Sequence, residues 1–501
     1  MKGRITAGGI LLFFILATVA IIQRQTVHIA APIIPPSLKG ANLIIISVDS
    51  LRTDHMSLYG YDRQTTSAID TWARGGVVFD KNYSTSYLTP IAEESVQTGL
   101  NPAENGVVNF ESSLKAFVRT LPELLRAGGY QTAAFGTSPE FVINDALKGN
   151  FSRGFDTYQP YDRPANPAPV DQGRDTDAPI TKSIAWLKNI PKKKPFFLWI
   201  PLGGVHWPYG SGFPHTFSDP NYHGMMNTAS ADDFISLYGH MYKSKNYADQ
   251  TSKSKITAED IAYVTGRYDD GIYGTDEMLQ KLFQYLEQSG LDKNTVVVLE
   301  SEHGEDFGEH GYIAHYDIYN EQVHTPLIIE APGLHAGHVS AITSSVDVAP
   351  TLLSMLGVSY PVLQGRNVFA ASTDESEAFI MRTPLWERVG NIVPAFASVD
   401  NITHYYDTAV RSGEWELIHR LSRAAQKKYS WWGILTGVPV DLPEYELYNV
   451  DRDPTEQNNI YSFEISNPDI ERLQQDLVRW EGQVKKEMPG PMNPTIIQPY
   501  F

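Results

Sequence analysis

Residues 41–50 read ANLIIISVDS, and this stretch decides the fold class. Positions 43–46 hold four consecutive aliphatic residues, with no alternation between apolar and polar side chains. Such a run is typical of a central parallel strand that helices cover on both faces. Three later apolar stretches have the same character: YQTAAF at 130–135, PFFLWIPL at 195–202 and NTVVVLES at 294–301.

Helical segments alternate with these strands, as in a doubly covered α/β sheet. The clearest is DEMLQKLFQYLEQSG at 276–290, which has one apolar face and a terminal glycine. From about residue 370 the pattern changes to short strand-like segments, followed by a charged helix near 469–486. We therefore expect a catalytic α/β domain over residues 41–370 and a smaller C-terminal α+β subdomain with its tail over residues 371–501.

Composition excludes several classes of function. The 501 residues carry a formal charge of −18 and include no cysteine. A surface this acidic argues against nucleic-acid binding, because phosphate backbones need Lys and Arg for neutralisation. An anionic substrate would need a locally positive group, most simply a metal ion. The absence of cysteine excludes disulfides, thiolate nucleophiles and cysteine-based metal sites.

The N-terminus predicts a membrane anchor. Lys2 and Arg4 precede an uncharged run at 5–22, which as a helix would span about 27 Å, roughly one bilayer core. The apolar region of a cleaved signal peptide, the alternative, is usually shorter. We expect an anchor over residues 1–25 and a Pro-rich linker over residues 26–40. The basic flank stays cytoplasmic, which makes this a single-pass protein with its bulk on the periplasmic or extracellular side.

Polar residues follow two of the buried strands. Asp49 comes directly after the first strand, and Glu302 and His303 follow the strand at 294–301. Active sites in open α/β sheets collect at the carboxyl ends of strands. Each signal alone is weak, since an Asp at a strand end often caps a helix. Together, their oxygen and nitrogen donors predict a divalent-metal site.

A third element is the segment LTPIAEESVQTGL at 88–100. Thr89 followed by Pro90 is typical of a helix start, with Thr as the N-cap and Pro at the first helical position. One interpretation is that Thr89 only caps the helix. The other is that its hydroxyl, beside free N–H groups and the positive end of the helix dipole, attacks an anionic substrate.

The order of these segments resembles the sulfatase family of the alkaline phosphatase superfamily. The resemblance runs from residue 41 to about residue 460, and several blocks in family order are more specific than any single motif. Its blocks lie at 48–84, 89–107, 194–209, 294–333, 344–358 and 445–459.

The resemblance implies an alkaline-phosphatase-like α/β fold with a doubly covered mixed sheet and a smaller C-terminal domain. It also implies that one divalent ion (Mn, Zn, Ca or Mg) is bound by Asp49, Glu302, His303 and Thr89. Thr89 would be the nucleophile and form a covalent ester with sulfur or phosphorus. His206 and His315 would bind the anion or protonate the leaving oxygen, and His310 would shape its loop.

Several residues depart from the family pattern. Sulfatases proper convert a Cys or Ser to formylglycine within a Cys/Ser-x-Pro-x-Arg signature, and Thr89 cannot form that aldehyde. Glu93 stands where the basic residue is expected; Glu93 and Glu94 would repel a dianion, or simply favour the helix dipole as first-turn carboxylates. Other departures are Ser50 and Glu302, each in place of an Asp, and Asn105, where a histidine is frequent.

We therefore predict a membrane-anchored, metal-dependent, sulfatase-like hydrolase of sulfate or phosphate esters without formylglycine. Thr89 favours a phosphodiester or phosphonate monoester, because threonine nucleophiles occur in relatives with that chemistry. The substrate would be an anionic ester, with a glycan or a lipid headgroup as candidates, and no nucleic acid is expected. One alternative is a degenerate member that binds a glycan or protein; another is a phosphoglycerol or phosphoethanolamine transferase. Segments 159–180 and 207–255 would line the entrance to the pocket.

Overall fold

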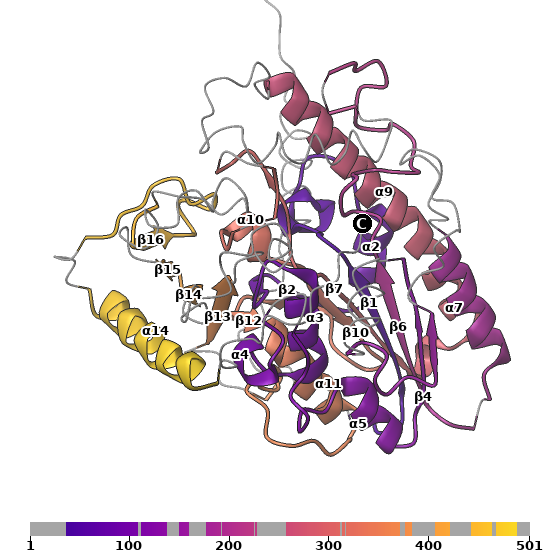
Figure 1. Cartoon of the computed structure of the whole chain (residues 1–501). Coiled ribbons are helices and arrows are strands. Elements are labelled where there is room, and N and C mark those ends of the chain that lie inside the picture. The colour runs from indigo at the N-terminus through magenta and orange to yellow at the C-terminus, as the bar shows by residue number, and fades with distance from the viewer. Residues whose placement is uncertain are drawn as a thin grey trace, which may run out of the picture.

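The computed structural model (Figure 1) describes residues 37–487, except for 109–111, 138–149, 160–176, 192, 225, 228–256, 311–312, 316, 371–375, 383–405, 421–441 and 463–466. The predicted anchor and nearly all of its linker lie outside the described residues, as do most of the two segments expected at the pocket entrance. Within the described part of the chain, no helix combines the length and the apolar character that a membrane span requires.

Eight strands form the central sheet, in the order β11-β2-β10-β7-β1-β6-β4-β5. β1 is parallel to both of its neighbours, β6 and β7, whereas β10 runs antiparallel to β7 and β2. The sheet is therefore mixed, as the resemblance implies. In that order the strands are Gly337–Val339, Val77–Phe79, Leu327–Glu330, Thr295–Glu300, Asn42–Val48, Phe196–Leu202, Gln131–Phe135 and Thr157–Gln159.

Helices cover both faces of this sheet (Figure 1). All seven residues of β1 are buried. Ile44 and Ile46 belong to one hydrophobic core, while Leu43 and Ile45 belong to the core on the opposite face. This confirms the prediction from the aliphatic run. The first core includes helices α2 (Ser67–Ala73), α7 (Ala178–Asn189) and α9 (Ala258–Ser289), and the second includes α3 (Thr89–Thr98), α5 (Leu121–Ala127) and α11 (Val348–Met355).

Helix α9 is longer than the predicted segment 276–290. It starts after a capping box formed by Thr257 and Asp260, and it ends at the left-handed Gly290 as predicted. Its N-terminal half contains glycines, which weaken a helix-forming pattern. A Cβ on Gly274 would lie 2.0 Å from the ring of Phe213. The glycine therefore allows the loop after β6 to pack closely on the helix.

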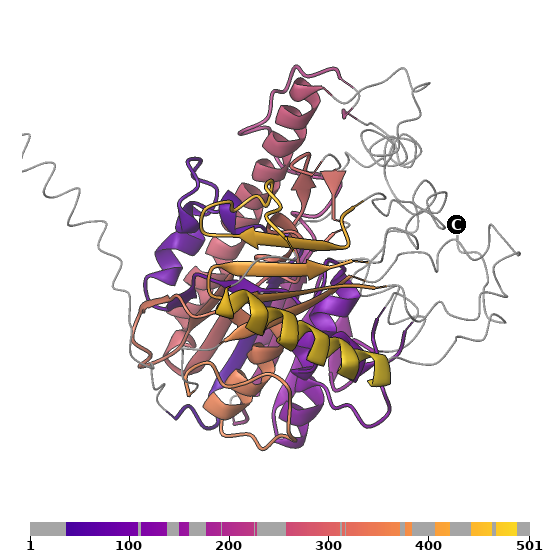
Figure 2. The same ribbon diagram turned by 90° about the vertical axis from the view of Figure 1, so that its left-hand side faces the viewer.

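The C-terminal subdomain is an antiparallel sheet covered by one helix (Figure 2). The predicted short strands and charged helix are present. The helix α14 (Pro468–Glu487) packs its Leu473, Leu477 and Trp480 into a separate hydrophobic core on this sheet. The strands are β13 (Glu377–Arg382), β14 (Asp407–Ser412), β15 (Trp415–His419) and β16 (Tyr445–Asn449).

A buried ionic network ties this subdomain to the loop after β9 (Ile313–Ala314). Arg420 Nη1 lies 2.7 Å from Asp317 Oδ1 and 3.2 Å from Asp407 Oδ2, and its Nε donates to Glu446. Arg382 also pairs with Asp317. Burial opposes ionisation of Asp317, but the two arginines outweigh it and lower the pKa of that carboxyl.

Replacing Arg420 with methionine should destabilise the protein by about 3–5 kcal/mol, because buried carboxylates then lose their counter-ion. Lys281→Met is the control. It breaks an exposed pair with Asp177, and its cost should stay below about 1 kcal/mol. Urea denaturation of the two variants measures the difference. Equal, small shifts in the midpoint would show that the network contributes nothing.

Candidate active site

The site forms where the ends of β1 and β7 meet the start of α3. Asp49 follows β1 directly, Glu302 and His303 follow the end of β7, and Thr89 is the first residue of α3. Because β1 and β7 are parallel neighbours, their carboxyl ends lie at the same edge of the sheet. All four side chains are buried.

Thr89 does not cap helix α3. Leu88 is the N-cap residue, and no side chain caps this end. Thr89 Oγ1 instead lies 2.9 Å from His303 Nε2. The prediction of a Thr N-cap was wrong because the extended backbone ends one residue earlier, at Leu88. The threonine hydroxyl is therefore directed to the end of β7.

His303 accepts the hydrogen of this hydroxyl. Its Nδ1 lies 2.9 Å from the carbonyl oxygen of Gly304, which can only accept a hydrogen bond. The Nδ1 atom therefore carries the hydrogen and the Nε2 atom carries a lone pair. Burial lowers the pKa of His303 to about 3, so the ring is neutral. His303 Nε2 also lies 3.5 Å from Asp49 Oδ1.

Ser50 holds a strained backbone beside Asp49. Its φ is +64°, which side chains other than glycine rarely adopt. Tyr268 fixes this turn by donating from its hydroxyl to the Ser50 carbonyl at 2.6 Å. Ser50 Oγ donates to Asp49 Oδ1 at 3.1 Å. Ser50, which stands in place of a family Asp, therefore orients the carboxylate of Asp49. Backbone strain such as that at Ser50 is typical of functional sites.

Glu302 lies in a buried group of carboxylates. Oxygens of Glu93, Glu300 and Glu302 lie within 4.8 Å of one another. Neither oxygen of Glu302 has a hydrogen-bond partner among the described residues. Burial, followed by the charges of Asp49, Glu300 and Glu93, raises the pKa of Glu302 well above its usual range. A carboxyl in such a place is stabilised by a proton or by a bound cation.

Two of these carboxylates differ from expectation. Glu93 is fully buried in the second turn of α3, so its interpretation as a first-turn carboxylate was wrong. The sequence analysis did not predict Glu300 as a site residue, because a single Glu at the end of a strand is usually exposed to solvent at the edge of a sheet. The available signal was the acidic run ESEHGED at 300–306.

The structure brings Thr89 Oγ1 and Asp49 Oδ1 close to His303 Nε2, whereas it groups Glu302 with Glu93 and Glu300. Asp49 and Glu302 offer carboxylate oxygens, Thr89 a hydroxyl and His303 a nitrogen lone pair, which are ligands for Ca²⁺, Mg²⁺, Mn²⁺ or Zn²⁺. The unpartnered oxygens of the buried Glu302 are the observation that supports a bound divalent ion most directly.

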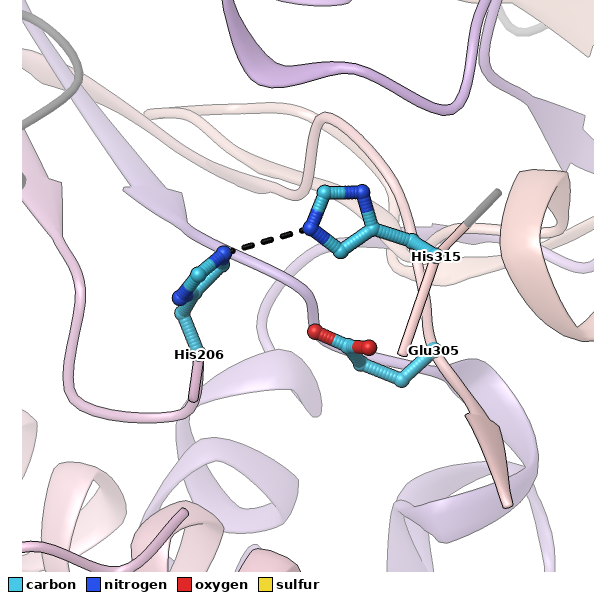
Figure 3. Close-up of side chains that lie close together, drawn as sticks. All are labelled: His206, Glu305 and His315. Atoms are coloured by element: carbon cyan, nitrogen blue, oxygen red, sulfur yellow. Dashed lines mark hydrogen bonds between the residues drawn. The ribbon is translucent and has the colours of Figure 1, made fainter. Parts of the chain in front are cut away.

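His206, His315 and Glu305 form a second group beside the first (Figure 3). The Nε2 atoms of the two histidines are 3.2 Å apart, and the His315 ring centroid lies 4.2 Å from that of His303. Burial, then the proximity of His303 and His206, lowers the pKa of His315 well below its usual range. Burial raises the pKa of Glu305 to about 7. Glu305 was not predicted, since it lies in an acidic loop without a motif of its own.

Two other predicted positions lie apart from these groups. His310 stacks on the Tyr319 ring with a centroid distance of 3.5 Å and an interplanar angle of 5°. Asn105 Oδ1 accepts the Val107 N–H at 2.7 Å, which holds the turn after α4 (Pro102–Asn105). The contacts of His310 and Asn105 therefore hold their own loops in place.

The mixed sheet, its covering helices and the small C-terminal domain form an alkaline-phosphatase-like α/β fold. The family described as Sulfatase matches residues 41–358, more than half of the chain. A second family, described as N-sulphoglucosamine sulphohydrolase, C-terminal, matches residues 308–483. The chain therefore belongs to the sulfatase family of the alkaline phosphatase superfamily.

Individual relatives are more distant. The N-acetylglucosamine-6-O-sulfatase of Bacteroides thetaiotaomicron is 26% identical, over 84% of this chain and 83% of the relative. A solved structure in complex with its substrate D-glucosamine-2-N,6-O-disulfate has a TM-score of 0.64 and 23% identity, covering 89% of this chain and 99% of the other. The phosphonate monoester hydrolase of Agrobacterium radiobacter has a TM-score of 0.61 and 18% identity, covering 89% and 96%.

Adding Mn²⁺ or Ca²⁺ to the EDTA-treated protein should raise its melting temperature, because the ion offsets repulsion among buried carboxylates. At a hundredfold excess over Kd the expected stabilisation is about 2.7 kcal/mol. Asp49→Asn and Glu302→Gln should each reduce this gain, whereas Asp451→Asn, an exposed carboxylate paired with Lys81, should not. Thermal melts with and without metal measure the effect. A gain in Glu302→Gln equal to that of the wild type would contradict the assignment.

Proposed function

We propose that this chain is a metal-dependent hydrolase of sulfate or phosphate esters with Thr89 as its nucleophile. The observation that carries the proposal is the contact between Thr89 Oγ1 and the lone pair of His303 Nε2 at 2.9 Å. It directs a buried hydroxyl toward a group of metal-ligand donors instead of the helix backbone.

In the proposed reaction, Thr89 Oγ1 forms a bond to the sulfur or phosphorus atom while the bond to the leaving alcohol oxygen breaks. Water then hydrolyses the threonine ester and restores the hydroxyl. Asp49, Glu302, His303 and Thr89 would hold the divalent ion, which as a Lewis acid would favour the alkoxide. Ser50 keeps Asp49 oriented, and the burial of all four ligands limits access of water before attack.

His206 and His315 both lie next to the ring of His303. They come from the loops after β6 and β9, and the His206 and His303 ring centroids are 6.4 Å apart. This position suits contact with the substrate anion or the leaving oxygen, as the resemblance implies. The structure adds Glu305 to the pair.

The charge of the site favours a singly charged ester. Glu93, Glu300 and Glu302 are buried together, and none of them pairs with a Lys or Arg in the described part of the chain. Where a bound cation keeps these carboxylates ionised, their charges would repel a dianion such as a phosphate monoester. Sulfate monoesters, phosphodiesters and phosphonate monoesters carry one charge. Relatives that act on sulfated sugars support the first class, and the threonine nucleophile supports the other two.

A binding protein without catalysis is the second candidate, because Glu93 occupies the position of a basic family residue. One panel separates the two. The full-length chain is assayed with an aryl sulfate, an aryl phosphodiester, an aryl phosphonate monoester and N-acetylglucosamine 6-sulfate in the presence of divalent metal. Turnover of any of them supports the hydrolase; bound metal without turnover supports the binding protein. A labelled headgroup passed to an added alcohol would instead indicate a transferase.

Thr89→Ala should lower kcat at least about 10³-fold, because it removes the nucleophile, and Thr89→Ser should keep measurable turnover. Thr98→Ala is the control. This buried threonine lies at the other end of α3 and donates to the Glu94 carbonyl at 2.5 Å, so kcat should change less than about tenfold. Turnover that is unchanged in Thr89→Ala would remove Thr89 from the reaction.

We further propose that the chain is anchored in a membrane by residues 5–22 with its bulk outside the cytoplasm. The support is the uncharged run behind Lys2 and Arg4. N-terminal sequencing of the mature protein tests it. A mature chain that starts after residue 22 would show cleavage instead of anchoring.

A further inference from the structure

We infer that the edge of the central sheet opposite the active site docks on anionic phospholipid and holds the active site away from the anchoring bilayer. The ester substrate then reaches Thr89 from the aqueous phase, and a lipid headgroup of that bilayer does not. The inference rests on the proposed function and on the proposed anchor at residues 5–22. The docking face consists of six exposed residues: Lys39, Lys193, Lys194, Lys293, Tyr360 and Val362.

The described chain enters the domain at this edge. The Leu38 N–H donates to the Met355 carbonyl oxygen at 3.0 Å, at the end of α11, and β1 begins shortly afterwards. Figure 2 shows the indigo start of the described chain at the lower edge, near the orange loop that follows α11. Asp49 lies at the other end of β1, and the extended run from Ala41 to Asp49 covers about 26 Å. A tether that arrives at Leu38 therefore leaves the active site on the far side of the sheet.

The tether alone does not fix the orientation of the domain. Residues 23–37 separate the uncharged run from Leu38 and can extend over about 50 Å. A linker of this length lets the domain turn over in front of the bilayer. A fixed orientation therefore requires a second contact with the membrane, and the side chains around the entry point supply it.

Four lysines lie at the amino ends of three neighbouring strands. Lys293 precedes β7, Lys39 precedes β1, and Lys193 and Lys194 precede β6. Because β1 is parallel to both of its neighbours, these lysines share one edge of the sheet. All four are exposed, and none is in an ion pair within the part of the chain that the structure describes. In a chain with a charge of −18, a basic row of this kind indicates an anionic partner surface.

Nearby carboxylates offset only part of this positive charge. Asp292 adjoins Lys293, but its Oδ1 is buried. Glu330 is partly buried and accepts a hydrogen bond from Trp72 Nε1 at 2.7 Å. Glu287, in the last turn of α9, is exposed and opposes the lysines directly. The four exposed lysines outnumber it, so the edge stays basic.

An apolar loop projects beside the lysines. The chain turns after α11 at Gly357, where a Cβ would lie 3.3 Å from the Lys39 side chain. Further along this loop, Tyr360 is 37% exposed and Val362 is 97% exposed, the largest fraction among the large apolar residues that the structure describes. A single exposed valine is ordinary. Its place beside a tyrosine, the lysines and the tether indicates a lipid surface, because membrane interfaces favour tyrosine and attract basic side chains.

Docking at this edge determines the source of the substrate. The headgroup layer is about 5–8 Å thick on each side of the hydrocarbon core. The active site lies about 26 Å from the docking face along β1. A lipid headgroup therefore cannot reach Thr89 without leaving the bilayer, whereas an ester on a glycan can. The relatives that act on sulfated sugars support the same source.

Fluorescence quenching tests the docking face. The chain has no cysteine, so a single introduced cysteine is labelled specifically. The full-length protein is placed in vesicles of phosphatidylcholine and phosphatidylglycerol that contain a lipid with a nitroxide on its headgroup. A fluorophore on Val362→Cys should be quenched. A fluorophore on Glu259→Cys should not, because this exposed residue at the start of α9 lies about 45 Å along the helix from its other end (Figure 1).

Charge reversal tests the lysines. Lys193→Glu combined with Lys194→Glu should lower the ratio of quenched to unquenched Val362 label at least about 30-fold, because each lysine near an anionic surface contributes about fivefold. High salt should lower the ratio in the wild type through screening. The control combines Lys485→Glu with Lys486→Glu, two exposed lysines of α14, which changes the net charge equally and should leave the quenching unchanged.

The same vesicles test the source of the substrate. An aryl sulfate and an aryl phosphodiester are offered either dissolved in water or attached to a lipid. The protein should hydrolyse the dissolved ester and leave the lipid-borne ester intact. Equal hydrolysis of both forms, or quenching at Glu259→Cys, would overturn the inference. Absence of quenching at Val362→Cys would also overturn it and leave the face to a protein partner. Quenching at Val362→Cys without hydrolysis of any ester would contradict the proposed function and support the docking face.

Discussion

The parallel pairing of β1 with β7 is the constraint on which the site depends. It brings Asp49 and His303 to one edge of the sheet, where the start of α3 places Thr89 within 2.9 Å of His303. The three segments are far apart in sequence, and only the register of two buried strands aligns them. A change of register by one residue would turn alternate side chains to the other face of the sheet. The buried aliphatic run of β1 therefore supports the chemistry as well as the fold.

Buried charge is the second theme of the molecule. Arginines of the C-terminal sheet neutralise Asp317 close to His315, so the smaller subdomain helps to hold the loop that carries this histidine. At the candidate site, by contrast, buried carboxylates lack positive partners. Glu302 and Glu305 have raised pKa values, and each has an oxygen without a hydrogen-bond partner among the described residues. The overall charge of −18 makes bound metal the simplest counter-ion for these groups. The proposal of a bound metal ion follows from this imbalance.

Much of the fold was predictable, because strands buried on both faces have a recognisable sequence. Asp49 and His303 were predictable as residues at strand ends. The direction of the Thr89 hydroxyl was not, since a Thr-Pro helix start has the same sequence whether the hydroxyl caps the backbone or faces a partner. Glu300 and Glu305 were missed because their importance lies in contacts that a linear pattern does not reveal. The pairing of Arg420 with Asp317 joins residues 103 positions apart and has no local signal.

The most direct test of the account is whether Thr89 becomes esterified during turnover. The enzyme would be mixed with an ester that it hydrolyses, quenched within one turnover, digested and examined by peptide mass spectrometry. The account predicts a sulfuryl or phosphoryl group on Thr89, formed as the first alcohol is released and lost as water completes the cycle. Product release with Thr89 unmodified at every time point would contradict it.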